Sequence, residues 1–383
     1  MSPDAPTFDA VSFDAVSFDA VWTGDGFRGP TTFRIRDGHL RPSDSATRDA
    51  GHATATATRH LGGTLFPRLT DHHVHLGLVD PVALFAGGIT HAVDLGWDPA
   101  IATSWLRDDP RSPSVAIAGA LLTAPGGYPV RSGWAPPGAA REVGGPREAR
   151  RAVREQVMAG ASRIKVALNS EAGETVDDAT LDAIVEEAVH AGLSVVAHAQ
   201  GAGQAARAVR AGVTQLAHTP FSERVPATAI DDAVARGMSW ISTLDIHGWG
   251  APTRDHDTAV DNLRRFHAAG GRVLYGTDLG NGPLPLGVNA RELTALLSAG
   301  LDATTVLRSI AGGPGDDHLA DEAPIGSRLA WIPAAPPRDT ALLPAWLATA
   351  RGLRAGDLTA TDLHTATSTP TSTPTTSTEG PLP

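Results

Sequence analysis

Short apolar runs alternate with longer amphipathic stretches along the chain from residue 65 onward. Short apolar runs bounded by turn residues are typical of buried strands, and longer stretches with interleaved polar positions favour helices. The pattern predicts strands at 65–76, 90–95, 115–122, 163–168, 194–199, 214–218, 239–244 and 272–277. Between them it predicts helices at 146–159, 178–191, 205–211, 227–236, 258–269 and 288–299.

Three of the predicted helices end in an Ala-Gly pair, whose glycines are Gly160, Gly192 and Gly212. Glycine just beyond a helix end commonly adopts the left-handed conformation that closes the helix. Alternation of strand and helix predicts a parallel sheet, and eight strands are the number that closes a barrel. The expected fold class is therefore α/β, a (β/α)8 TIM-like barrel. A doubly wound open sheet is the alternative, disfavoured because no Gly-x-Gly-x-x-Gly follows an early strand.

The segments on either side of the barrel predict a small β domain built from both chain ends. Residues 31–36 and 39–41 alternate around Asp37-Gly38, a strong hairpin signal, and 325–333 could be a strand that joins them. The segment 44–58 is expected to be a loop, and the Phe-Asp-Ala-Val-Ser repeat at 8–21 is interpreted as a duplicated stretch ahead of the first strand. The predicted parts are 1–64 and 317–350 for the small domain, 65–316 for the barrel, and 351–383 for a Thr/Ser/Pro-rich, mostly disordered tail.

Composition narrows the class of protein. With 383 residues, 42% hydrophobic and 19% charged, the chain is typical of a globular protein. A net charge of -11 without a Lys/Arg cluster argues against a nucleic-acid partner. The absence of cysteine excludes disulfides, thiolate metal sites and cysteine nucleophiles. No secretory signal and no membrane-spanning apolar run is visible, so no membrane contact and a cytoplasmic location are expected.

Polar side chains gather where predicted strands end. Period-two geometry places His73 and His75, with Asp71, on one face of the first strand, and His72 with Val74 on the other. Further polar residues end the later strands. They are His198, His218 and Asp278. Because the carboxyl ends of barrel strands meet at one mouth, these side chains are expected to share a metal ion.

Lys165 lies inside the predicted strand 163–168, which should be buried. Burying a lone ammonium is costly unless it is paired or its pKa falls. A neutral lysine can react with CO2 to form a carbamate, whose two anionic oxygens are able to bridge two metal ions. On this segment alone, a lysine paired with a nearby carboxylate is the alternative.

This order of residues resembles the binuclear metal-dependent amidohydrolase superfamily, with prolidase-like and imidazolonepropionase-like enzymes, over residues 65–310. The resemblance implies that His73, His75 and Asp278 hold the more buried of two divalent ions, with zinc expected first. It implies that His198 and His218 hold the other ion and that carboxylated Lys165 bridges the two. It further implies that a metal-bridging hydroxide attacks an amide C–N bond while Asp278 shuttles the proton. An N-acyl amino acid, a dipeptide or a cyclic amide would be the small-molecule substrate.

Loops after the strand ends should select the substrate, and five of their side chains are candidate contacts: Tyr128, Arg131, Trp134, His247 and Trp249. Arg131 could pair with a substrate carboxylate. A mononuclear deaminase, which lacks the bridging lysine, and a lactone or ester hydrolase remain alternatives, as does a non-catalytic family member. His and carboxylate ligands also accept Mn, Fe, Co or Ni. A homo-oligomer is compatible with the sequence, which determines neither substrate nor oligomeric state.

Two segments depart from the family pattern. Pro67-Arg68 stands where Pro-Gly is usual, and 309–314 replaces the common Asn-Pro-Ala signature. Both lie outside the six residues of the expected metal site, so they bear on the subfamily and not on the superfamily.

Overall fold

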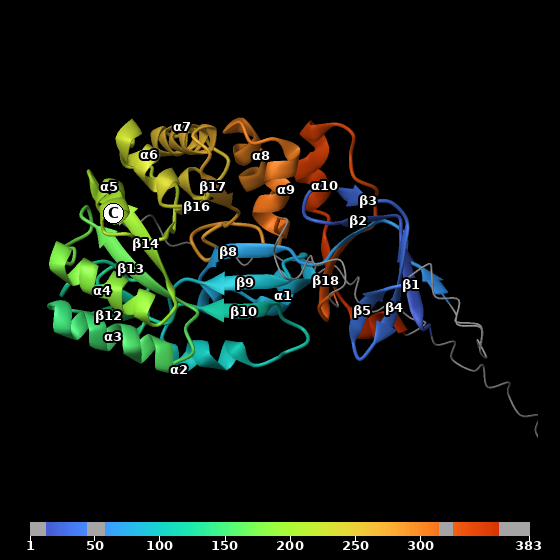
Figure 1. The fold of residues 1–383 in the computed structure, drawn as a ribbon, viewed down its shortest axis with the longest axis horizontal. Coiled ribbons are helices and arrows are strands. Elements are labelled where there is room, and N and C mark those ends of the chain that lie inside the picture. The colour runs from blue at the N-terminus through green and yellow to red at the C-terminus, as the bar shows by residue number, and fades with distance from the viewer. Residues whose placement is uncertain (1–12, 44–57, 314–324, 360–383) are drawn as a thin grey trace, which may run out of the picture.

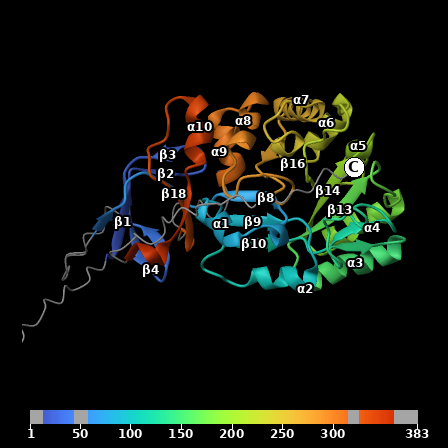
Figure 2. The ribbon, with the colours of Figure 1, turned by 180° about the vertical axis from the view of Figure 1, so that it is seen from behind.

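The computed structural model describes residues 13–43, 58–313 and 325–359. Parallel strands occupy the middle of the larger part of the molecule, with helices around them, and smaller sheets lie at one end (Figure 1). Figure 2 shows the same two parts from behind. Among the helices of the described ranges, none is long and apolar enough to cross a membrane.

The parallel strands form a three-stranded sheet in the order β10-β9-β8 and a seven-stranded sheet in the order β12-β11-β13-β14-β15-β16-β17. Their bounds are β8 Thr70–Val74, β9 His91–Asp94, β10 Ser114–Ile117, β11 Leu121–Thr123, β12 Ala140–Glu142, β13 Arg163–Asn169, β14 Ser194–Gln200, β15 Gln215–Leu216, β16 Ser239–Ile241 and β17 Arg272–Leu274. Three residues separate β10 from β11, so one stretch of chain serves both sheets. Hydrogen bonds also join the β8 segment to the segment that follows β17. The His72 N–H donates to the Tyr275 carbonyl (3.0 Å), and the His75 N–H donates to the Leu279 carbonyl (2.8 Å). The architecture is mixed α/β and TIM-barrel-like.

Helices follow the strands along the chain. The longer ones are α3 Pro146–Met158, α4 Asp178–His190, α5 Gln204–Arg210, α6 Ala227–Ala235, α7 Arg254–Ala268, α8 Ala290–Ser298 and α9 Ala303–Ala311. The predicted glycine caps are confirmed, since Gly160, Gly192 and Gly212 have φ of 86°, 71° and 81°. Helix α7 begins earlier than predicted because the Thr253 hydroxyl accepts the His256 N–H at its first turn. Helix α9 was not predicted; Asp302 caps it.

Three shorter helices are α1 Pro81–Ala86, α2 Pro99–Ala102 and α10 Leu343–Leu347. Two smaller sheets, in the orders β5-β4-β1-β6 and β19-β18-β7-β2-β3, stand beside the parallel strands. They consist of β1 Ala15–Phe18, β2 Ala20–Trp22, β3 Phe27–Arg28, β4 Thr31–Arg36, β5 His39–Pro42, β6 Thr58–His60, β7 Thr64–Phe66, β18 Arg328–Ile332 and β19 Arg351–Arg354. The predicted hairpin is present as β4 and β5, which pair antiparallel. The second sheet joins strands from both chain ends, because β18 pairs with β7.

The predicted strand 65–76 is two strands, not one. Proline has no N–H to give to a ladder, and Pro67 separates β7, which pairs with β2 and β18, from β8, which pairs with β9. The predicted strand 115–122 is likewise interrupted between β10 and β11, where Gly119 has a φ of 72°.

Two expectations about the chain ends are wrong. The repeat does not lie ahead of the first strand, because β1 and β2 are formed by its last copies, with Val16 and Phe18 fully buried. The tail does not begin at 351, because β19 pairs antiparallel with β18 and a 3-10 helix at Ala355–Thr359 follows. The apolar Leu353 and Leu358 pack in the same cluster as Val16, which explains the order of this segment. Residues 360–383, most of 44–58 and the start of the repeat lie outside the described residues.

An aromatic cluster joins the second small sheet to α10. Phe66 is fully buried, and its ring centroid lies 5.8 Å from that of Trp346, 5.9 Å from that of Phe27 and 6.4 Å from that of Trp22. Rings at such distances and tilts attract one another beyond the burial of their area.

We expect Phe66→Ala to lower the free energy of unfolding by about 3–5 kcal/mol, because it removes buried area and leaves a cavity between three rings. Urea denaturation followed by tryptophan fluorescence measures the change. Leu342→Ala is the matched control, since Leu342 is 56% exposed and its removal should change stability by about 0.5 kcal/mol or less. Equal losses in the two variants would show that the cluster adds no stability.

Candidate metal centre

Strand β8 places two histidines at its carboxyl end, both buried. The ladder between β8 and β9 shifts register between Asp71 and Val74. His72 lines a cavity at the amino ends of the strands, and the carboxylate of Asp71 accepts the Thr277 hydroxyl at 2.6 Å. His73 and His75 still reach the same neighbour, the carboxylate of Asp278.

Asp278 follows β17 with a φ of 57°, in the left-handed region that favours glycine. Such a conformation costs about 1–3 kcal/mol in a residue with a side chain, and it is typical of functional sites. The backbone turn directs Asp278 Oδ1 to 3.0 Å from His73 Nε2 and 3.2 Å from His75 Nε2. The other oxygen, Oδ2, accepts the Asn281 amide N–H at 3.0 Å.

Backbone carbonyls fix the tautomers of both histidines. His73 Nδ1 lies 2.8 Å from the Ala217 carbonyl and His75 Nδ1 lies 3.1 Å from that of Gly96. A carbonyl only accepts, so Nδ1 carries the proton and Nε2 presents a lone pair to Asp278. Among the described residues, His73 Nε2 and Asp278 Oδ1 are buried without a hydrogen-bond partner. A cation between them would satisfy both atoms.

His198 of β14 and His218, two residues beyond β15, complete the cluster. The His218 ring centroid lies 4.6 Å from that of His73 and 4.8 Å from that of His198. His218 Nδ1 contacts the Thr243 hydroxyl at 3.0 Å, and His198 Nε2 contacts Gln200 Oε1 at 3.1 Å. One ring nitrogen of each histidine is thus held by the protein, and the other is left for a ligand.

Burial keeps these imidazoles neutral. It lowers the pKa of His73 to about 4 and that of His198 to about 3, each with a further contribution from the positive charge of Lys165, and it lowers the pKa of His218 well below its usual value. Neutral imidazole is the form that binds a metal ion. Ligand atoms of His73, His218 and Asp278 all lie within 4.8 Å of one another, a spacing that suits one ion.

Lys165 of β13 is 1% exposed. Burial lowers its pKa to about 7, although the charges of Asp278 and Asp94 act in the opposite direction. A substantial fraction of the amine is therefore neutral at pH 7 and nucleophilic. Lys165 is also the only lysine in the sequence. All the other residues counted as Lys or Arg are arginines. Sequence reasoning missed this signal.

Asp94, at the carboxyl end of β9, is a further buried group that sequence reasoning missed. Its carboxylate accepts the N–H groups of Leu76 (2.8 Å) and Gly96 (3.1 Å) and so fixes the segment that follows His75. Burial raises its pKa. Its position at the end of an apolar run, as for His198, is the signal that could have identified it.

Two predicted substrate contacts lie against the histidines. The Tyr128 ring stacks on that of His198, with centroids 4.9 Å apart, and the Trp134 ring lies 4.7 Å from that of His75. Trp134 Nε1 donates to the Tyr128 hydroxyl at 3.2 Å. Burial raises the pKa of Tyr128 to about 12, so its phenol stays protonated. These two side chains form one wall beside the cluster.

The other three candidates differ in their surroundings. Burial lowers the pKa of His247 to about 4, and its Nε2 atom is buried without a hydrogen-bond partner among the described residues. Trp249 is 45% exposed and donates to the Asn281 carbonyl at 3.3 Å. Arg131 is exposed, and no contact in the described part of the chain joins it to the cluster.

A buried carboxylate holds the loop after β16. Glu292 of α8 accepts the N–H groups of Leu244 (3.0 Å) and Asp245 (2.7 Å). Asp245 in turn accepts from Asn289 at 2.7 Å and from Arg291 at 2.9 Å. This network fixes the loop that contains Thr243 and His247.

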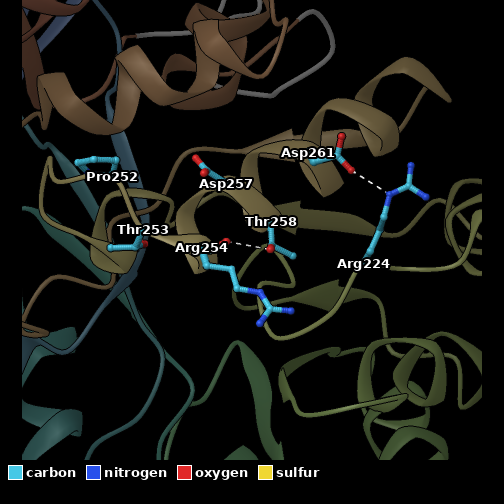
Figure 3. A pocket seen from close by; sticks show the side chains of 7 residues that line it. All are labelled: Arg224, Pro252, Thr253, Arg254, Asp257, Thr258 and Asp261. Atoms are coloured by element: carbon cyan, nitrogen blue, oxygen red, sulfur yellow. Dashed lines mark hydrogen bonds and ion pairs between the residues drawn. The ribbon is translucent and has the colours of Figure 1, made fainter.

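A cavity of about 540 Å³ opens at the start of α7, away from the histidines (Figure 3). Arg224 pairs with Asp261 across it at 3.2 Å, and the Thr258 hydroxyl donates to the Arg254 carbonyl at 2.8 Å. Charges of both signs line this cavity, and its lining includes none of the six predicted metal-site residues.

The TIM-barrel-like fold and the cluster of histidines with Asp278 are those expected of a hydrolase in the amidohydrolase class. Residues 64–311 match the model of the amidohydrolase family, and the chain belongs to that family. It is therefore an enzyme that hydrolyses C–N bonds. No curated protein matches the sequence.

Solved structures share the fold at low sequence identity. Ochratoxinase from A. niger is 20% identical with a TM-score of 0.69, over 88% of this chain and 94% of that one. A putative prolidase from Bifidobacterium longum is 21% identical with a TM-score of 0.66, over 88% and 92%. Molinate hydrolase is 15% identical with a TM-score of 0.66, over 97% and 100%. These matches fix the fold as TIM-barrel-like with additional structure outside the barrel.

Glu292 should make stability depend on pH. Burial raises its pKa from 4.5 to about 7, so the folded state retains a proton that the unfolded state releases. The stabilisation is present below pH 4.5 and is lost as pH rises through 7. Between these values, the free energy of unfolding of the native chain should fall by on the order of 2 kcal/mol relative to Glu292→Gln. Urea titrations at pH 4.5, 6 and 8 measure the difference, and parallel curves would contradict it.

Proposed function

We propose that the cluster holds two divalent metal ions and hydrolyses an amide C–N bond in a small molecule. The proposed ligands of one ion are His73, His75 and Asp278, those of the other are His198 and His218, and carboxylated Lys165 bridges the two. The observation that carries the proposal is the pair of buried, unpartnered atoms His73 Nε2 and Asp278 Oδ1, 3.0 Å apart. Neutral imidazole nitrogens with a carboxylate favour zinc.

When bound, two such ions would lower the pKa of a water molecule and polarise the carbonyl of an amide. The chain's own residues then handle the proton. Asp278 is the carboxylate at the centre of the cluster, and Asn281 holds its Oδ2 atom. We propose that Asp278 accepts the proton of the attacking water and transfers it to the leaving amine.

Lys165 supports the binuclear form of the site. Attack of its neutral amine on CO2 forms an N–C bond, and loss of one proton leaves a carbamate with a single negative charge. That anion would replace a buried ammonium by a group that attracts cations. Arginine cannot react in this way because its guanidinium stays protonated, which gives a reason for the one lysine in a chain otherwise using arginine.

The wall of Tyr128 and Trp134 suits the substrate class. Two rings, tilted by 48° with their centroids 6.3 Å apart, lie beside neutral histidines and offer an apolar surface with one phenolic donor. An N-acyl amino acid, a dipeptide or a cyclic amide has an apolar part for this surface and a carbonyl for the cluster. His247 Nε2 offers a further polar contact.

We further propose that the parallel strands close into a (β/α)8 barrel over 65–316, with 1–64 and 317–350 forming one small β domain. The hydrogen bonds from His72 to Tyr275 and from His75 to Leu279 support closure. The sheet shared by β2, β7 and β18 supports the small domain, now extended to β19.

Asp278→Asn should reduce kcat by about 10³-fold, because an amide cannot accept the proton. A panel of N-acyl amino acids, dipeptides and cyclic imides supplies the substrate, and plasma emission spectroscopy gives the metal content. Asp231→Asn, which removes a carboxylate exposed on α6, is the control and should leave kcat unchanged. Full turnover in a metal-loaded Asp278→Asn enzyme would remove Asp278 from the mechanism.

Lys165→Met should remove the carbamate and reduce the metal content from two ions per chain to about one. ¹³C NMR with labelled bicarbonate measures the carbamate directly: Lys165 is the only lysine in the sequence, and comparison with the variant separates its carbamate from that of the terminal amine. The native chain should give a carbamate resonance that the variant lacks. One ion per native chain with no such resonance would instead favour the mononuclear deaminase, for which adenine-type and cytosine-type amines are the substrates to test.

A further inference from the structure

A second cavity, of about 450 Å³, lies at the amino ends of the parallel strands. Five of the residues that line it are the first residues of their strands: Thr70 of β8, His91 of β9, Arg163 of β13, Gln215 of β15 and Arg272 of β17. Arg163 precedes Lys165 by two positions on β13, so both side chains lie on one face, about 7 Å apart along the strand. The cavity and the histidine cluster therefore occupy opposite ends of the same lumen.

An apolar layer separates the two ends. Val93, Val196, Ile241 and Leu274 belong to one buried cluster inside the strands. Val93 and Leu274 also line the cavity. Because close-packed side chains fill this layer, a ligand in the cavity does not contact the metal-site residues.

The charge of the cavity is one-sided. Its described lining contains four arginines, Arg68, Arg163, Arg272 and Arg308, and neither aspartate nor glutamate. The ion pairs formed within the described residues include none with Arg163, Arg272 or Arg308. The contacts of Arg163 and Arg308 are with neutral oxygens, those of Ser162 (3.3 Å) and Gly24 (3.0 Å). Like charges gathered at a half-buried site attract an anion.

Gln215 gives a second, independent sign of a missing ligand. Its Oε1 atom is buried without a hydrogen-bond partner among the described residues. A buried acceptor left unpaired costs about 1–3 kcal/mol, so such atoms normally meet a donor. A ligand for this cavity would need several acceptor oxygens for the guanidinium groups and one O–H for Gln215.

We propose that this cavity is a binding site for hydrogenphosphate, separate from the catalytic centre. At neutral pH this dianion has three oxygens that accept from guanidinium groups and one hydroxyl that donates to Gln215. Planar guanidinium donors match phosphate oxygens in pairs. Sulfate has the same shape and charge but no hydroxyl, so the site should prefer phosphate.

Isothermal titration of the full chain with inorganic phosphate, and separately with sulfate, tests the proposal at low ionic strength in a chloride buffer. Arg272→Gln and Arg308→Gln should each raise the Kd for phosphate about tenfold or more, because each removes a charge-assisted contact. Both arginines are exposed, and circular dichroism confirms that the variants fold. Arg147→Gln is the matched control: Arg147 is exposed on α3, and the cavity lining does not include it.

Gln215→Leu should reduce the preference for phosphate over sulfate to about one. Amide hydrolysis should be unchanged in Arg272→Gln, so a failure of the proposed hydrolase function leaves this test intact. Phosphate affinity equal in the native chain and in Arg272→Gln would overturn the proposal, because the ion would then bind elsewhere, such as at the metal ions. No binding at low ionic strength would also overturn it.

One competing occupant is the chain itself. The sequence that follows the cavity-lining Gly312 carries four carboxyl groups, at Asp316, Asp317, Asp321 and Glu322. Phosphate binding that appears only after these four residues are replaced by Asn and Gln would show that the chain neutralises its own arginines. The proposal of a ligand site would then be wrong.

Discussion

A nitrogen lone pair and a carboxylate oxygen face each other across 3.0 Å at the carboxyl ends of the strands, and the rest of the site depends on this pair. The Ala217 carbonyl holds the proton of His73 on the far side of the ring, so no proton is available between His73 Nε2 and Asp278 Oδ1. Both atoms are buried, and neither has a hydrogen-bond partner among the described residues. Lone pairs that repel at such a distance are stable only around a positive charge. The arrangement therefore suits a cation, which would satisfy both atoms.

The same constraint explains the strain and burial nearby. Asp278 adopts a left-handed backbone because that turn brings Oδ1 to both histidines of β8, and Asn281 restrains the other oxygen. Burial removes the positive charge from His198 and His218 and lowers the pKa of Lys165 to about 7. Each effect converts a group that would repel a metal ion into one that could bind it. The burial of these groups is therefore both the electrostatic cost to the metal-free protein and the source of its affinity for cations.

The sequence pattern predicted features that depend on the local chain, such as residues at strand ends. It missed features that depend on pairing with neighbouring strands. His198 and His218 were predicted because each ends an apolar strand, and strand ends of a parallel sheet converge. The register shift in β8 was not predicted, because it follows from pairing with β9. Asp94 was missed because its partners are backbone N–H groups across a loop, which have no signature in side-chain order. Arg131 was proposed from its residue type alone, and its loop leaves it exposed.

The two ends of the parallel strands show how one strand can serve opposite electrostatic purposes. Strand β13 begins with Arg163, in a cavity lined by guanidinium groups, and two residues later presents Lys165 to neutral imidazoles and carboxylates. Both side chains are cationic when free, yet only the lysine can lose its proton near pH 7, because the delocalised charge of arginine persists even when burial lowers the pKa of Arg163 to about 10. Residue type at two positions of one strand therefore decides which end attracts anions and which can accept metal ions. The apolar layer of Val93, Ile241 and Leu274 separates the arginine-lined cavity from the histidine cluster, so a ligand at one end does not contact the other.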